Sequence, residues 1–325
     1  MDYNKELFEE FYKNIVVKEY KNLEKMKNDA KREKNSNKFL ESFLVFFGII
    51  IYLFCSYYFK KNNWDKNFVI LIGLLYFFGA LLVFWFFSRN AKQNDYKIIF
   101  KEKIIKKLLL LIDNNLTYHP NGFIDSTIYN KADFEKYDKY YSDDFVSGKL
   151  KNGFNFILGD IKTEVEGTDR HGHRKFFEQF SGLFVSMECP KDFKESLYIR
   201  INKNMLTKIL NYKLPYKKLK LDLDSSFFEK EFDVYASNKI IALQLLTSDI
   251  MQLLVDFKKE MDMQYEITIK DNHIYYRFFC GELFEPNDLD KHSLDKDFLY
   301  KYYKIMKFSL FLSEKLTDLI EDTEY

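Results

Sequence analysis

The segment Glu164–Lys175, EVEGTDRHGHRK, carries the residues of this sequence that are best suited to binding a metal ion. Alternate residues of an extended strand point to the same side, so His171 and His173 would present both imidazole rings together. Two imidazoles and a carboxylate, such as Asp169 or Glu166, are a common ligand set for zinc. The same histidines, however, bracket a glycine within a run of charges, which is typical of a solvated hairpin tip. The sequence therefore predicts a solvated loop here and no metal site.

A second group of titratable residues, Asp143, Asp144 and Asp160, would suit general acid–base chemistry if the fold brought them together. Solvated strand ends are the simpler interpretation of all three. His119 precedes Pro120 in a predicted turn, and its sequence context does not indicate catalysis. The sequence contains no phosphate-binding glycine loop, nucleophile elbow, zinc-binding helix motif or kinase signature. We therefore predict no catalytic residue, no cofactor and no metal ligand.

The charge balance argues against nucleic acid as a partner. The 325 residues include 50 Lys and Arg against 49 Asp and Glu, whereas nucleic-acid binders usually carry a basic excess. The three cysteines, Cys55, Cys189 and Cys280, are far apart and form no CxxC pair. A disulfide framework or a thiolate zinc site is therefore not expected.

Two uncharged apolar runs predict a transmembrane hairpin. They are Ser42–Phe59 and Phe68–Ser88, and each is close to the roughly 20 residues that a helix needs to cross the hydrocarbon core. A backbone within lipid must satisfy its own hydrogen bonds, so both runs should be helical. The alternative interpretation is a pair of buried core helices, which seldom run this long without a charge. The lipid bilayer is thus the first expected partner.

The positive charges predict the orientation of this hairpin. The loop Lys60–Asn67 is too short to hold a domain, so both termini lie on one side of the membrane. The loop carries three Lys, whereas the segments 25–38 and 89–107 together carry thirteen Lys and Arg. By the positive-inside rule, both termini are expected to be cytoplasmic.

Long helices are expected to flank the hairpin. Residues 2–33 show apolar side chains at helical spacing, which predicts an amphipathic helix packed on the soluble domain, on another copy, or on the membrane surface. The second transmembrane helix should continue to Asp113, because the stretch 88–113 has no Pro or Gly and carries an apolar stripe. The expected domains are an amino-terminal helix over 1–37, the hairpin over 38–88, a juxtamembrane helix over 89–117 and a soluble domain over 118–325.

The soluble domain is predicted to be α+β with a mostly antiparallel sheet. Strand-like segments occur in pairs that turn signals separate, and helices are expected over 246–261, with Thr247 or Ser248 as N-cap, and over about 295–321. The predicted strand segments are 145–150, 154–165, 182–189, 196–201, 265–270 and 274–280.

Four segments carry a family resemblance: YYSDDFVSGKLKNGFNF, FSGLFVSMECPKDF, FEKEFDVYASNKIIALQLLTSDIMQLL and NHIYYRFFCGELFE. Together with the charged amino-terminal helix and the two apolar runs, they resemble the bacterial membrane-protein family known as domain of unknown function 3137. The resemblance implies a multi-pass protein of the bacterial inner membrane, and it implies no activity or catalytic residue. The shared positions suit structural roles: turns or close approach for the glycines and a core for the others. These positions are Gly148, Gly153, Gly182, Phe180, Phe228, Phe232, Val234 and Tyr235.

Two classes of function follow from the sequence. The first is a membrane-anchored scaffold or regulatory module whose cytoplasmic domain binds a lipid headgroup, a protein partner or a second copy of the chain. The second is a membrane-tethered enzyme that uses the acidic and His-bearing loops. A pocket gathering Asp160, Glu164, His171 or His173 would favour the enzyme, and an apolar groove without convergent polar groups would favour the module.

Overall fold

The computed structural model describes residues 3–62, 71, 73–79, 82, 91–189, 194–202, 219–220, 223, 225–286 and 294–322. These residues form two compact units. Unit 1 consists of Met1–Tyr12, Ile104–Glu285 and Asp295–Tyr325, and unit 2 consists of Lys13–Lys103 and Pro286–Leu294.

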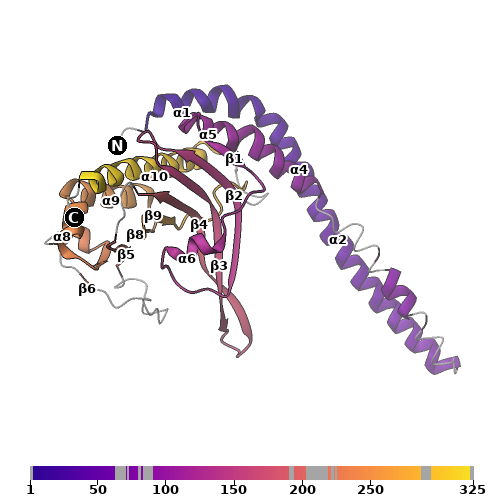
Figure 1. Ribbon diagram of the computed structural model, residues 1–325. Coiled ribbons are helices and arrows are strands. Elements are labelled where there is room, and N and C mark those ends of the chain that lie inside the picture. Colours follow the sequence, from indigo (N-terminus) through magenta and orange to yellow (C-terminus); the bar gives the residue numbers. More distant parts are fainter. Residues whose placement is uncertain are drawn as a thin grey trace. The chain divides into compact units, whose positions relative to one another are not determined.

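Unit 1 is built on an antiparallel sheet, which confirms the predicted α+β class (Figure 1). Its described strands are ordered β1-β2-β3-β4-β9-β8-β5-β7-β6, and every pairing is antiparallel. The strands are β1 (Thr117–His119), β2 (Lys139–Lys149), β3 (Asn155–Thr168), β4 (Arg174–Glu188), β5 (Leu197–Ile201), β6 (Leu219–Lys220), β7 (Phe232–Ala236), β8 (Tyr265–Lys270) and β9 (His273–Phe278).

Helices cover the two faces of this sheet unequally. The helices of unit 1 are α1 (Lys5–Phe11), α5 (Lys106–Ile112), α6 (Ser126–Lys131), α7 (Ser226–Glu229), α8 (Lys239–Leu245), α9 (Ser248–Met261) and α10 (Lys296–Asp322). On one face, α9 and α10 pack their aromatic side chains on β8 and β9, and Phe257 stacks on Phe308 with ring centroids 3.5 Å apart. On the other face, α6 packs against the sheet through an aromatic core that includes Tyr129, Phe180 and Phe184.

Local signals account for several of these elements. Thr247 caps α9, as predicted, by accepting the Ile250 N–H at 3.3 Å. Asp271 and Asn272 both have positive φ, which gives the β8–β9 hairpin the type of two-residue turn that matches the strand twist. The expected core residues Phe180, Phe228, Phe232 and Val234 are buried, and Tyr235 is half-buried.

Unit 1 includes more of the chain than the predicted domain 118–325. The predicted apolar stripe supplies Ile104, Ile105, Leu108 and Leu109, all of which are buried, to the core of this unit. At the amino terminus, Phe8 packs on Tyr300 and Tyr303 of α10. The compact unit therefore begins before residue 118, because residues from both predicted flanking helices complete its core.

Unit 2 consists largely of helix. The π-helical segment η1 (Tyr12–Val16) joins α1 to α2 (Val17–Asn62), so the helix is continuous across the predicted boundary at 37/38. The described part of the second helical segment returns through α4 (Ala91–Phe100) and the π-helical η2 (Lys101–Ile105) to α5, which ends one residue before the predicted Asp113.

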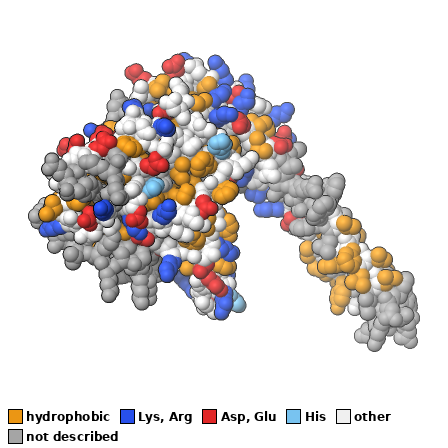
Figure 2. All heavy atoms as spheres, in the orientation of Figure 1, with side chains coloured by type: hydrophobic (Ala, Val, Ile, Leu, Met, Phe, Trp, Pro, Cys, Tyr) orange, Lys and Arg blue, Asp and Glu red, His pale blue; other side chains and the backbone are white. Residues whose placement is uncertain are grey.

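Of the described helices, the one over Lys5–Phe54 is long and apolar enough to cross a membrane, by length and composition. Its most apolar window has a mean hydropathy of 1.6, and large side chains such as Phe39 and Tyr52 are more than two-thirds exposed. Figure 2 shows hydrophobic side chains on the surface of the described part of this helix. The second predicted span, Phe68–Ser88, lies mostly outside the described residues. Within it, residues 73–79 are helical, and the Tyr76 hydroxyl donates to the Leu44 carbonyl of α2.

Candidate functional site

The predicted solvated loop is the tip of a longer hairpin than the sequence indicated. β3 and β4 extend to Thr168 and Arg174, and Asp169 orders the turn between them. Its Oδ1 accepts the N–H groups of His171 at 2.8 Å and His173 at 2.9 Å. These bonds, that of His173 foremost, hold the pKa of Asp169 below its usual range. One of the two carboxylates that the metal interpretation offered is thus engaged in shaping the turn.

We expect the double change His171→Ala and His173→Ala to alter the unfolding free energy by less than about 0.5 kcal/mol, as for other exposed positions. By contrast, Asp169→Ala should lower the melting temperature, because the turn loses its two backbone hydrogen bonds. Thermal melts and elemental analysis of the purified chain check both statements. One zinc ion per chain that disappears in the double variant would contradict them.

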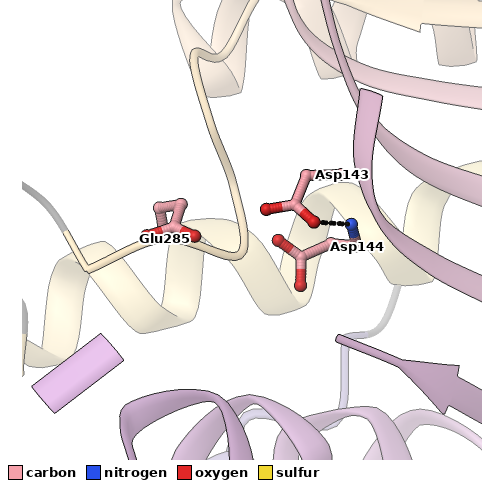
Figure 3. A group of neighbouring side chains, drawn as sticks. All are labelled: Asp143, Asp144 and Glu285. Carbon is pink, nitrogen blue, oxygen red and sulfur yellow. Dashed lines mark hydrogen bonds between the residues drawn. The ribbon is translucent and has the colours of Figure 1, made fainter. Parts of the chain in front are cut away.

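The three acidic residues of the sequence hypothesis do come together, at the β2–β3 pairing. Asp143 is the register partner of Asp160, and Asp144 follows at a β-bulge. Glu285, which sequence reasoning missed, joins them from the segment after β9: one carboxylate oxygen each of Asp143, Asp144 and Glu285 lies within 4.8 Å of the others (Figure 3). No local signal relates Glu285 to residues 143 and 144, because the contact depends on the complete sheet.

Asp160 lies in the protein interior beside these acids. Its Oδ2 accepts the N–H groups of Leu283 at 2.7 Å and Phe284 at 3.0 Å. Burial is the main reason that the pKa of Asp160 lies well above its usual range, and the charge of Asp144 adds to it against the two N–H donors. Asp144 is fully buried, and its Oδ1 accepts a hydrogen bond from the Tyr118 hydroxyl.

The histidines do not join this acidic group. Asp160 and Thr168 lie on the same strand, so at 3.3 Å per residue the hairpin tip is roughly 25 Å away. Glu164 forms ion pairs with lysines: its carboxylate lies 3.2 Å from Lys162 Nζ and 3.9 Å from Lys139 Nζ. The combination of acids and histidines that would have favoured an enzyme is therefore not assembled.

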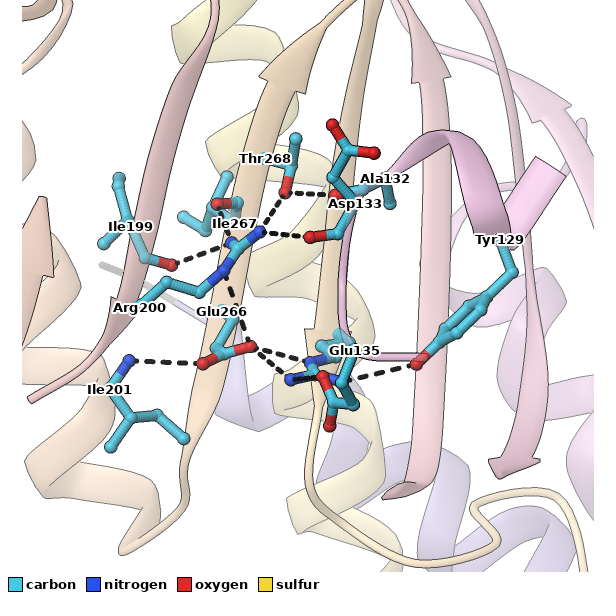
Figure 4. Close-up of polar contacts among 11 residues, drawn as sticks. Tyr129, Ala132, Asp133, Glu135, Ile199, Arg200, Ile201, Glu266, Ile267 and Thr268 are labelled. Atoms are coloured by element: carbon cyan, nitrogen blue, oxygen red, sulfur yellow. Dashed lines mark hydrogen bonds and ion pairs between the residues drawn. The ribbon is translucent and has the colours of Figure 1, made fainter. Parts of the chain in front are cut away.

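A second polar cluster, around Arg277, links the segment after α6 to the sheet. Figure 4 shows Glu135, Glu266 and Arg200 of this cluster between the two. Arg277 Nε donates to Glu266 at 2.8 Å, and its guanidinium also pairs with Glu135. Arg200 Nη1 donates to the Ile267 carbonyl at 2.7 Å. The four charged side chains are all at least nine-tenths buried. Because the charges balance and the donors bind backbone carbonyls, acids and the hydroxyls of Thr268 and Tyr129, this cluster is an internal support for the fold.

Acid is expected to weaken this support through Glu266. Burial opposes its ionisation, but the charges of Arg277 and Arg200 outweigh burial and hold the pKa of Glu266 below its usual range. A carboxyl whose pKa is lower in the folded state than in the unfolded state stabilises the fold at any pH above the unfolded-state pKa, which is about 4.3 for Glu. This stabilisation is lost as the pH falls through the folded-state pKa. Urea unfolding at pH 7, 4 and 3 should therefore show a smaller acid-induced loss in Glu266→Gln than in the wild type. Equal losses in both proteins would contradict this assignment.

An open hollow of about 490 Å³ lies beside the β1–β2 edge. Its lining residues are His119, Pro120, Asn121, Gly122, Phe123 and Phe145. The Phe123 side chain is 66% exposed, and the His119 ring lies 6.0 Å from that of Phe145. Gly122 admits this close packing, since a Cβ there would lie 2.6 Å from Phe145 Cβ. The hollow is thus largely apolar, and the four acids discussed above are not among its lining residues.

Comparison with known proteins supports the family resemblance over part of the chain. The family described as protein of unknown function (DUF3137) matches residues 178–317, from β4 to α10. No curated protein matches the sequence. Among solved structures, the crystal structure of the mycobacterial trehalose monomycolate transport factor A, TtfA, is similar at a TM-score of 0.37 and 7% identity, and the match covers 66% of this chain and 93% of that one. This similarity is too weak to carry an argument about function.

Proposed function

We propose that this chain is a membrane-anchored binding module that docks a protein partner in the hollow beside β1. The observation that carries the proposal is the open apolar surface around Phe123, where the described lining residues include one histidine and no acid. Pockets of a few hundred Å³ with this composition suit an inserted apolar side chain. The partner is accordingly a protein that presents an exposed aliphatic or aromatic residue.

The membrane part of the proposal combines several observations. The apolar helix within Lys5–Phe54 and the second apolar run would form a two-span hairpin with both termini in the cytoplasm. The family resemblance favours the inner membrane of a bacterium. Docking in the hollow would then take place at the cytoplasmic face of that membrane.

The test compares two single substitutions in the full chain, purified from native membranes. Phe123→Asp places a charge in the hollow, whereas the control Ile240→Asp places one at a residue of α8 that is 70% exposed. The proposal expects one protein to be retained by the wild type and by Ile240→Asp and to be lost with Phe123→Asp. Equal retention by all three would refute docking in the hollow, and retention of only further copies of this chain would replace the partner by self-association.

A membrane-tethered enzyme is the second candidate, and the convergence of Asp143, Asp144 and Glu285 is the observation in its favour. It ranks second because the neighbouring carboxylates serve the fold: Asp160 binds two backbone N–H groups and Asp144 binds Tyr118. The histidines that would complete an acid–base set lie at the distant hairpin tip.

A further inference from the structure

We propose that two copies of this chain associate through the free edge of β4, in one antiparallel register centred on Phe176. β9 pairs with β4 only between Leu183 and Glu188. Toward the hairpin tip, the segment Arg174–Glu178 pairs with β3 on one side and, among the described residues, with no strand on the other. Figure 1 shows this end of the hairpin extending beyond the other strands. The free edge and the docking hollow lie on opposite sides of β3, so this proposal does not depend on the hollow.

The free edge can accept another strand because its main chain is regular and exposed. All residues of Arg174–Glu178 are exposed, and no hydrogen bond joins their main chain to a described segment other than β3. The segment begins directly after the turn and ends at a bulge, where the register with β3 shifts and Gln179 has no opposite residue. An unpaired strand edge of this kind is a template for pairing with another chain.

Symmetry restricts how two identical edges can pair. Two such antiparallel strands are related by a twofold axis perpendicular to the sheet, and this axis keeps every side chain on its own face. A residue of one copy therefore lies opposite its own counterpart, or opposite a residue an even number of positions away. An axis at Phe176 uses the whole regular segment, because Arg174 and Glu178 are its two ends.

In this register the facing side chains are complementary. Phe176 lies opposite its own copy, and at each end Arg174 of one copy lies opposite Glu178 of the other. The Arg174 and Glu178 side chains are 86% and 57% exposed, so both can reach a second strand. Within one copy, Arg174 Nη1 is 3.6 Å from Glu166, and Glu178 is 3.5 Å from Lys162 Nζ. Pairing would join these ion pairs into a row of alternating charge, and aromatic and opposite-charge pairs both stabilise antiparallel strands.

Neighbouring registers lose this match. An axis at Phe177 would place Phe176 opposite Glu178 and leave both charges without an opposite charge to face. An axis at Lys175 would place two lysines opposite each other, which is unfavourable. The charges of the edge therefore favour a second copy of this chain as its occupant. Because the paired segment is short, we expect a reversible dimer rather than a permanent one.

The register is tested by cysteine cross-linking of the full chain in detergent, with Phe176→Cys and the matched control Phe177→Cys. The two positions are similarly exposed, at 45% and 44%. Only position 176 lies opposite its own copy, at a Cα–Cα distance that a disulfide can span. Mild oxidation should therefore link Phe176→Cys into a dimer well above the background of the native cysteines, and Phe177→Cys should stay at that background. Equal cross-linking at both positions, or none above background at 176, would overturn the proposal.

The charge match is tested by sedimentation equilibrium of the full chain in detergent. Arg174→Glu and Glu178→Arg each place like charges opposite one another, so each should raise the dimer dissociation constant at least about tenfold. The control Arg170→Glu changes an exposed residue of the turn and should dimerise as the wild type does. An equimolar mixture of the two test variants should associate again, because the two acids of one then face the two arginines of the other.

Recovery in the mixture also shows that both test variants are folded, which a loss of association alone would not. Single variants that dimerise like the wild type, or a mixture that associates no better than its components, would overturn the proposal. A wild-type chain that remains a monomer would also overturn it, and would mean that the charges protect this edge from pairing.

Discussion

Replacing Arg277 with Met is expected to lower the unfolding free energy by about 3–5 kcal/mol, the usual cost of removing one partner from a buried ion pair. Arg277 is 3% exposed and pairs with both Glu266 and Glu135. Methionine fills much of the same volume but leaves these two buried carboxylates without their shared cation. Loss of the guanidinium would also remove a packing contact with the segment after α6, because Arg277 Cζ lies 4.3 Å from the centre of the Phe134 ring.

Denaturant unfolding of the full chain measures this cost, with Arg174→Met as the matched control. Arg174 pairs with Glu166 at 3.6 Å, but its side chain is 86% exposed, so the control should lose no more than about 1 kcal/mol. The deficit of Arg277→Met should shrink toward acid pH, where protonation removes the buried negative charges. A loss as small as that of the control would show that the Arg277 cluster does not support the sheet.

The second large effect is expected for Gly182→Ala, with a loss of about 3 kcal/mol or more. Gly182 lies on β4 where it approaches β9, and a Cβ at this position would lie 1.9 Å from the Phe278 carbonyl oxygen. Real Cβ atoms do not approach oxygen so closely, so the strands must separate and disturb the centre of the sheet. The Leu183↔Phe278 pairing begins at the next residue.

Gly172→Ala is the control for this prediction. Gly172 has a left-handed φ of 82°, but a Cβ there would meet open space at the hairpin tip. Gly172→Ala should therefore lower the unfolding free energy only by the cost of placing alanine in a left-handed conformation, about 1–2 kcal/mol. Comparable losses at both positions, measured by thermal unfolding, would show that steric contact with Phe278 is not what requires a glycine at 182.

Local signals explain why so much of the sheet was predictable. The hairpin between β8 and β9 follows from Asp271 and Asn272, which tolerate positive φ, and from the alternation of Tyr265, Ile267 and Ile269 with polar residues. The Thr247 cap likewise marks the start of α9. Each of these features depends on residues within a few positions of one another.

Features that depend on distant residues escaped prediction. The carboxylates of Asp143 and Asp144 lie close together at a bulge that no local residue pattern predicts. Glu285 reaches them from the segment after the ninth strand, and the amino-terminal Phe8 packs on a helix near the other end of the chain. The burial of Leu108 was not predicted for the same reason, since an apolar stripe does not reveal which surface will cover it.

Docking of a protein partner in the hollow beside β1 can be measured by photo-crosslinking in native membranes. A photoreactive amino acid is placed at position 123 in one protein and at position 240 in a second, because both side chains are highly exposed. If a partner docks in the hollow, position 123 gives one adduct with a different protein, and position 240 gives none of that mass. The same adducts from both positions, or no adduct from position 123, would contradict it.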